Sequence, residues 1–342
     1  MLSPHPKNFC AIDPKEQAKL IVVIDTEEEF NWSLDFSPQN TSVKSMRSIG
    51  RIQAVFDEYR IRAVYVVDYP VVVDPEGYRP LEEIYKSDRC VIGAHLHPWV
   101  NPPLEEEVNR RNSFPGNLAP SLEAAKLRIL GDLIGERFGS QPVIYKAGRY
   151  GIGPNTADIL EDQGYEVDLS VCPYMDYSHE GGPNFIAYSA QPYWFGKKHR
   201  LLEIPLSVGF VGWLKPWGGL CSELVAQYPF NKLRLGGLLA RTGLLDRIWL
   251  SPEGYTLTEN LTLLRSLYRA GVRTFSFAFH SPSLEPGNTP YVTSQKELDR
   301  FIAHCRDFLD SFMGEFDGVP TTPLELKMHL SVGSNNHSQE GK

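Results

Sequence analysis

Short apolar runs alternate with longer amphipathic stretches along most of the chain. Seven runs have the length of β-strands, and most of them contain several apolar residues in succession rather than in alternation. Parallel strands covered on both faces have this composition, so the pattern predicts a parallel sheet with helices packed on it. The predicted strands are 20–25, 63–68, 90–95, 143–147, 166–170, 201–206 and 274–280.

Between these runs, apolar residues at three- and four-residue spacing predict amphipathic helices. Gly139, Gly164 and Gly271 directly follow three of them, where a left-handed helix cap is expected. Interleaved strands and helices favour an α/β fold with a single barrel-like (β/α) domain, and a doubly wound open sheet is the alternative. The predicted helices are 45–59, 122–138, 155–163, 258–270 and 295–312.

Two stretches depart from the β/α repeat. Residues 172–200 are rich in Pro, Gly, Tyr and Trp, and a loop of this length usually lines a functional site. We interpret 211–257 as an insertion between the sixth and seventh strands, with an apolar helical segment near 233–245. The polar residues from about Ser331 onward predict a disordered tail. The expected divisions are an N-terminal extension at 1–19, a barrel at 20–315 and a C-terminal segment at 316–342.

Composition and charge exclude several classes of protein. The 342 residues are 42% hydrophobic and 22% charged, the balance of a soluble globular protein. The formal charge of −8 offers no attraction to the phosphates of nucleic acid, which we do not expect as a partner. No apolar run approaches the roughly 20 residues that cross a bilayer. The first 19 residues lack the apolar centre of a secretory signal, which predicts a cytoplasmic location. A homo-oligomer is compatible with the sequence.

Acids and imidazoles follow the ends of two predicted strands. The first strand ends in Asp25 and is followed by the run Glu27–Glu29, an acidic cluster that needs a cation or a basic partner near a buried strand. The third strand ends in His95 and His97, whose side chains point the same way, about 7 Å apart, in an extended chain. Because the carboxyl ends of parallel strands converge on one mouth, we expect these groups to lie together.

Three further strands bring ionisable residues to the same end of the sheet. Arg149 and Tyr150 follow the fourth strand, Asp168 lies on the fifth, and His280 ends the seventh. Two imidazoles and one carboxylate with an open position are typical of a hydrolytic metal site. A histidine from another strand, such as His280, would supply a general acid.

Each of these residues also has a structural interpretation. The His-x-His pair occurs on surfaces, and the run Glu27–Glu29 would be stable as a solvated loop. Arg149 could simply pair with Asp168, and His280 could be a hydrogen-bonded core histidine.

Five motifs stand in order along the chain: Asp25-Thr26-Glu27, His95-Leu96-His97, Arg149-Tyr150-Gly151, Asp168 and Phe279-His280-Ser281-Pro282. Together they resemble the motifs of the polysaccharide deacetylases, also called the NodB-homology family or carbohydrate esterase family 4. The similarity extends over about residues 20–315 and is closest to the WalW-type branch. The resemblance implies a distorted (β/α)₇ barrel and metal-dependent removal of N- or O-acetyl groups from sugars.

The resemblance also implies catalytic roles at matching positions. Asp25 corresponds to the family's catalytic base, Arg149 to the arginine that orients this base, and His280 to the histidine acid. Asp168 falls where the family often places an acidic partner of the final histidine or of the arginine.

The implied metal ligands are Glu27, His95 and His97. The common family form has two aspartates in the first motif, and here Glu28 competes with Glu27 for the acidic ligand position. The usual second motif is His-x-x-x-His, but position 99 is Trp99, so the second imidazole must be His97. The resemblance implies a divalent ion, zinc first, with nickel, cobalt or manganese as alternatives.

The leading hypothesis is a metal-dependent deacetylase that acts on an acetylated sugar or glycan precursor. One alternative is a hydrolase of another C–N bond, such as a cyclic amide, as in an allantoinase. The other is a catalytically silent carbohydrate-binding barrel. The aromatic residues of the loops 172–200 and 211–217 would stack on the sugar, although the same residues could instead pack in the core. The residues expected to contact substrate are Glu28, Trp99, Tyr150, Tyr174 and Trp194.

Overall fold

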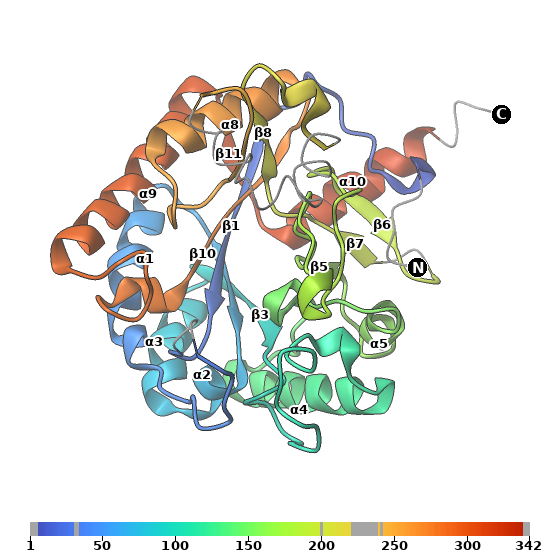
Figure 1. Ribbon diagram of the computed structural model, residues 1–342, viewed down its shortest axis with the longest axis vertical. Coiled ribbons are helices and arrows are strands. Elements are labelled where there is room, and N and C mark those ends of the chain that lie inside the picture. Colours follow the sequence, from blue (N-terminus) through green and yellow to red (C-terminus); the bar gives the residue numbers. More distant parts are fainter. Residues whose placement is uncertain (1–5, 31–33, 199–200, 220–238, 240–241, 338–342) are drawn as a thin grey trace.

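In the computed structural model, which describes residues 6–30, 34–198, 201–219, 239 and 242–337, a curled sheet is wrapped by helices (Figure 1). Its strands are β1 (Lys19–Thr26), β2 (Ala63–Val67), β3 (Cys90–Leu96), β4 (Ile144–Ala147), β5 (Val167–Asp168), β6 (Tyr193–Phe195), β7 (Leu201–Glu203), β10 (Thr274–His280) and β11 (Val319–Pro320). They follow the order β10-β1-β2-β3-β4-β5-β7-β6, with β11 beside β1. All the pairs are parallel except β6 with β7. The seven predicted strands and the α/β class are confirmed.

The segment after β7 and strand β10, at opposite edges of the parallel sheet, meet at a junction that we call the barrel seam. They are joined there by a few hydrogen bonds and not by continuous strand pairing. Ser207, which follows β7, and Ser276 on β10 each donate a backbone N–H to the other's Oγ, both at 2.9 Å. The segment at Leu250 lies between them, because its N–H donates to the Ser207 carbonyl and its carbonyl accepts from Ala278. The sheet therefore curls into a distorted barrel, and the open doubly wound alternative is wrong.

Helices cover the outer face of the sheet. The predicted helices are present, and Gly139, Gly164 and Gly271 have φ values of 78°, 81° and 90°, as expected of left-handed caps. Two helices after β2 were not predicted. The first is short and has a proline in its first turn, and the second has Pro80 inside it. The helices are α1 (Ile49–Glu58), α2 (Tyr69–Val73), α3 (Pro75–Lys86), α4 (Pro120–Phe138), α5 (Thr156–Asp162), α8 (Leu257–Arg269), α9 (Gln295–Glu315) and α10 (Pro323–His337).

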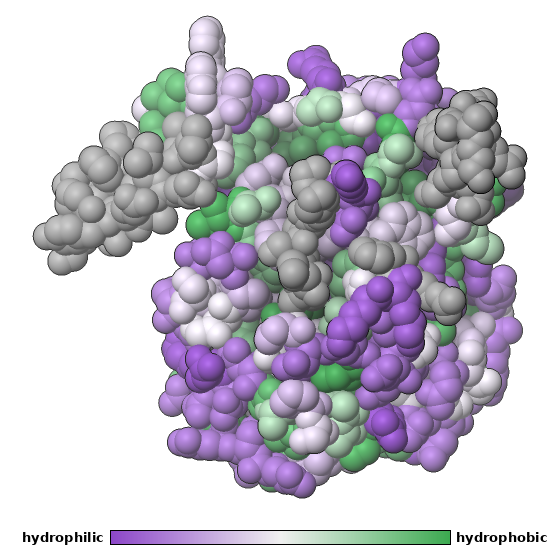
Figure 2. Space-filling model, turned by 90° about the vertical axis from the view of Figure 1, so that its right-hand side faces the viewer, coloured by the Kyte–Doolittle hydropathy of each residue, from purple (hydrophilic) through white to green (hydrophobic). Residues whose placement is uncertain are grey.

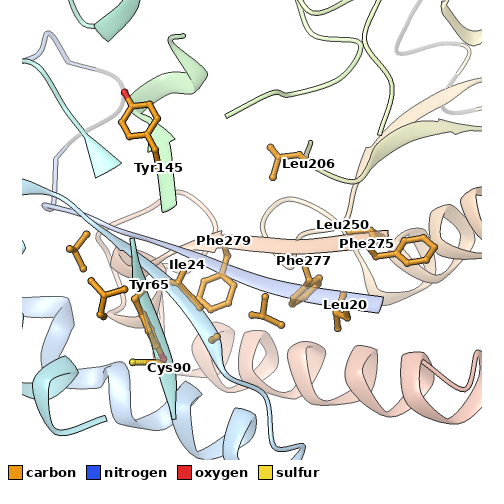
Figure 3. Close-up of a cluster of buried hydrophobic side chains, with 14 of the residues drawn as sticks. Leu20, Ile24, Tyr65, Cys90, Tyr145, Leu206, Leu250, Phe275, Phe277 and Phe279 are labelled. Carbon is orange, nitrogen blue, oxygen red and sulfur yellow. The ribbon is translucent and has the colours of Figure 1, made fainter. Parts of the chain in front are cut away.

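The larger core lies between the sheet and the helices of its outer face, which are all of these except α10. Alternate residues of β1, including Leu20 and Ile24, share a cluster of buried side chains with Tyr65, Phe277 and Phe279 (Figure 3). The aromatic residues of β10 continue into α9, where Phe277 stacks on Phe308 with ring centroids 4.3 Å apart. This packing fixes which face of each strand points away from the helices.

The opposite face of the strands forms a smaller core. Val23 belongs to it, together with Leu326 of α10. Lys327 of the same helix pairs with Glu166 at 2.7 Å, just before β5, so α10 lies at the amino ends of the strands. The next inward position on β1 is Asp25, at the carboxyl end, which leaves this end of the barrel available for a site.

The structure corrects one expectation about the irregular segments and adds detail to two others. The predicted disordered tail is helical as far as His337, because α10 is anchored by the buried Leu326 and Leu330, and its last residues 338–342 lie outside the described residues. The loop 172–200 contributes β6. The predicted insertion 211–257 contains β9 (Asp246–Trp249), which pairs antiparallel with β8 (Val208–Val211) at its start. Most of the predicted apolar helix near 233–245 also lies outside the described residues.

None of the helices in the described part of the chain combines the length and apolar character that crossing a membrane requires.

Candidate active site

Three buried ligand groups meet at the carboxyl ends of β1 and β3. Oε2 of Glu27 lies 3.4 Å from Nε2 of His95 and 3.4 Å from Nε2 of His97. The three side chains are buried, and their ligand atoms lie within 4.8 Å of one another. Two imidazole nitrogens and one carboxylate oxygen facing a common point fit a divalent ion that keeps open positions for water or substrate.

The other ring nitrogens have partners that orient both imidazoles. Nδ1 of His95 lies 2.9 Å from the Lys146 carbonyl, and Nδ1 of His97 lies 2.7 Å from Oε2 of Glu28. A proton on each Nδ1 leaves each Nε2 as a free electron-pair donor. Burial lowers the pKa of His95, and it lowers the pKa of His97 to about 4, so both rings are neutral near pH 7.

Glu28 supports His97 instead of facing the common point. Its second oxygen accepts the indole N–H of Trp99 at 2.7 Å, and its backbone N–H donates to Asp68 at 2.7 Å. The Trp99 ring also stacks on His97 with centroids 4.2 Å apart. This geometry favours Glu27 over Glu28 as the acidic ligand. It makes Glu28 and Trp99 positioning residues for His97 rather than residues that contact a substrate.

Asp25 is held by a buried lysine. Nζ of Lys146 lies 2.5 Å from both carboxylate oxygens of Asp25. Burial disfavours the charged form, but the electrostatic attraction of Lys146, followed by those of the His95 and His280 rings, outweighs it and lowers the pKa of Asp25 to about 2. Lys146 was not predicted as a site residue, although a lysine inside an otherwise apolar predicted strand was a usable signal.

His280 lies on the other side of Asp25, with its Nε2 3.6 Å from Oδ2 of the aspartate. Its Nδ1 is 2.7 Å from Glu253, whose carboxylate also accepts the backbone N–H of His280 at 3.1 Å and the hydroxyl of Ser283 at 2.5 Å. Burial disfavours the imidazolium, but the carboxylates of Glu253, Glu27 and Asp25 raise the pKa of His280 to about 10. The histidine is therefore a protonated acid at neutral pH.

Arg149 does not have the partner that was expected. Its guanidinium forms an ion pair with Glu180 and donates a hydrogen bond to Oγ of Ser113 at 2.6 Å. It also lies 4.2 Å from the centre of the Phe114 ring. Lys146 instead holds Asp25. The reason is local: Lys146 is inside β4 and points inward, whereas Arg149 follows the strand with a φ of 52°, which turns the chain.

Asp168 is also not where the resemblance predicted. Val167 faces the inner core, so Asp168 points to the other side of β5, where it accepts hydrogen bonds from Ser170 and lies beside Glu203. The acidic partner of His280 is Glu253. Nothing in the local sequence marks Glu253, which comes from the insertion and reaches His280 only in the folded chain.

Most of the predicted site residues line one cavity of about 350 Å³. Tyr150 lines it, as expected of a residue near the substrate. Tyr174 packs on Phe210 with ring centroids 4.9 Å apart, and it is not among the residues that line this cavity. Trp194 lies on β6 and lines a separate surface cavity together with Glu161 and Lys327. The right-hand side of the molecule in Figure 1, seen face-on in Figure 2, has a mostly hydrophilic surface with scattered hydrophobic patches. The predicted residues that line the 350 Å³ cavity are Asp25, Glu27, His95, His97, Arg149, Tyr150 and His280.

Solved structures with a similar fold are known. A Mycobacterium smegmatis protein assigned as a polysaccharide deacetylase superposes with a TM-score of 0.57 and 16% identity, over 98% of this chain and 96% of that one. The chain has the fold of the polysaccharide deacetylases. PuuE allantoinase superposes with a TM-score of 0.53 and 14% identity, over 96% of this chain and 97% of that one.

The same architecture occurs within a larger enzyme. The 4-α-glucanotransferase of Thermococcus litoralis superposes with a TM-score of 0.51 and 12% identity, over 91% of this chain and 40% of that one. No protein-family model matches the chain, and no curated protein sequence is significantly similar to it. At these identities the fold is shared and the reaction has to be argued from the site.

Proposed function

We propose that the protein is a metal-dependent hydrolase that removes an acetyl group from an N- or O-acetylated sugar or glycan precursor. The observation that carries the proposal is the convergence of three elements in one cavity: a Glu-His-His ligand set, a lysine-bound Asp25, and a glutamate-bound His280. This is an inventory for hydrolysis of an acyl bond.

Glu27, His95 and His97 would hold the ion, and their donor set suits zinc, with nickel, cobalt and manganese as alternatives. When bound, the ion supplies Lewis-acid chemistry: it polarises the acyl carbonyl and makes water acidic enough to be deprotonated by a carboxylate of low pKa.

The residues of the chain move the protons. The Asp25 carboxylate removes a proton from water as the water oxygen bonds to the acyl carbon, and Lys146 keeps this carboxylate ionised and oriented. His280 donates its Nε2 proton to the leaving nitrogen or oxygen as the bond from the acyl carbon breaks. Glu253 stabilises the imidazolium of His280 before this proton is transferred. Backbone N–H groups near Tyr150 are proposed to stabilise the oxyanion. The products are acetate and the free amine or alcohol.

The test is acetate release from a panel of acetylated sugars and nucleotide sugars. We expect Asp25→Asn, His95→Ala and chelation each to abolish release, while His179→Ala, at an exposed histidine, serves as the matched control. Full activity of the His95→Ala protein would refute the proposal.

A second candidate is hydrolysis of a cyclic amide, which the shared fold of PuuE allantoinase supports. The same base, acid and ligand set would serve this reaction. Product analysis separates the two candidates, because opening of a ring releases no acetate.

A further inference from the structure

A second cavity lies beside the proposed reaction centre. It has a volume of about 290 Å³ and shares five lining residues with the cavity that contains the proposed metal ligands: Asp25, Tyr150, Trp249, His280 and Tyr291. Two spaces of similar size therefore meet at the proposed base and acid. A substrate whose scissile bond lies between these residues would extend into both.

The walls of this side pocket are mainly apolar away from the reaction centre. Leu206, Leu250 and Phe279 line it and are buried, and they come from the three segments that meet at the barrel seam. Trp249 and Tyr255 add aromatic surface. An apolar group would be stabilised here by removal from water.

The charged groups at the inner end of the pocket already have partners. Nζ of Lys146 contacts both oxygens of Asp25, and the Glu253 carboxylate contacts His280 at 2.7 Å and Ser283 at 2.5 Å. A charged ligand would compete with these buried pairs and leave one member uncompensated. The pocket is therefore suited to an uncharged, apolar group.

We propose that the side pocket binds the acyl chain of the scissile bond and that the protein accepts acyl groups longer than acetyl. This inference rests on the proposed function. An acetyl group places only its methyl beyond the reacting carbonyl. At about 30 Å³ per water-sized group, 290 Å³ has room for on the order of ten such groups. The sugar lies in the other cavity, where Phe36 and Tyr177 offer aromatic surface.

The first experiment compares hydrolysis of N-acetyl-, N-butanoyl- and N-hexanoylglucosamine by the zinc-loaded protein. We expect kcat/KM to rise by roughly tenfold or more with the longer chains, since added methylenes fill an apolar pocket. Ala278→Leu narrows the pocket and should reverse this preference, whereas Leu206→Ala should extend it to longer chains. Ala270→Leu, at an exposed position before β10, is the matched control.

The second experiment measures binding of acetate, butyrate and hexanoate to the same proteins by calorimetry, and it does not depend on turnover. Affinity that rises with chain length, and no longer does so in Ala278→Leu, supports the inference even if no acylated sugar is cleaved. Binding that rises with chain length, without cleavage of any acylated sugar, would count against the proposed function but not against the acyl pocket. Cleavage of the acetyl substrate only, or equal affinity for the three carboxylates, overturns the acyl pocket and leaves the proposed function standing.

Discussion

Lys146 contacts both carboxylate oxygens of Asp25 at 2.5 Å, deep in the mouth of the barrel. Both side chains are buried, so each charge depends on the other. The lysine keeps a buried carboxylate ionised at the point where the proposed reaction needs a base.

Lys146→Met should lower kcat by roughly a hundredfold or more, because the pKa of Asp25 would rise with burial and its orientation would be lost. Steady-state kinetics with metal content measured in parallel checks this. Arg149→Met is the matched comparison, since Arg149 pairs with Glu180 and not with Asp25, and it should act mainly on KM. Equal losses of kcat in both variants would contradict the assignment.

Glu253→Gln should shift the alkaline limb of the pH–rate profile to lower pH by about one unit or more. His280 is the acid only while protonated, and Glu253 is the largest of the charges that raise its pKa to about 10. Removing that charge lowers the pKa, so the protonated form is lost earlier as pH rises. Ser283→Ala, which removes only a donor to Glu253, should move the limb less. An unshifted profile in Glu253→Gln would exclude this role.

Glu28→Gln should weaken zinc binding by about 10- to 100-fold. Glu28 accepts from His97 and Trp99 through separate oxygens, and an amide has one acceptor oxygen for these two donors. Competition with a chromophoric chelator measures the affinity directly, without reference to activity. Glu29→Gln is the control, because Glu29 instead accepts from Ser42 at 2.6 Å. Unchanged affinity in Glu28→Gln would argue against the support of His97 by this carboxylate.

Gly148→Ala should displace His97 and weaken metal binding. A Cβ at residue 148 would lie 2.4 Å from Cδ2 of His97 and 2.5 Å from the Leu96 carbonyl, so the imidazole must move. We expect a stability cost of about 1–3 kcal/mol as well. Gly50→Ala, where a Cβ meets nothing within 4 Å, should leave metal affinity unchanged. Chelator competition measures the metal affinity, and chemical denaturation measures the free energy of unfolding. Normal metal affinity in Gly148→Ala would contradict the prediction.

Glu123 should make stability depend on pH in a direction opposite to most carboxylates. Burial raises its pKa from 4.5 to about 7, and Oε2 has no hydrogen-bond partner among the described residues. The folded state then binds more protons than the unfolded state between these two values. The free energy of unfolding that this group contributes is fully present below pH 4.5, and about 3 kcal/mol of it is lost as the pH rises towards and past 7.

Glu123→Gln should remove this slope and stabilise the protein at pH 7, as measured by urea denaturation across pH. Glu136→Gln changes an exposed glutamate of the same helix and should leave the slope intact. A slope that persists in Glu123→Gln would assign the proton uptake to another group.

Much of the fold was predictable because strands and helices have local signatures. The parallel strands read as apolar runs, and the glycines that end three helices appear at their predicted positions. The unpredicted α3 contains a proline, and α10 depends on two buried leucines that meet the inner core only after the barrel forms. Cytoplasmic location, the WalW-type branch and a homo-oligomer stay predictions of the sequence.

The sequence by itself determined which groups reach the mouth of the barrel from β1, β3 and β10, because Asp25, His95 and His280 end strands whose pattern is local. The pairings were decided by tertiary structure. The side of β5 on which Asp168 lies, the insertion that brings Glu253 to His280, and the inward direction of Lys146 depend on contacts between distant segments. A carboxylate's partner is set by distance in space, and a linear pattern records only distance along the chain.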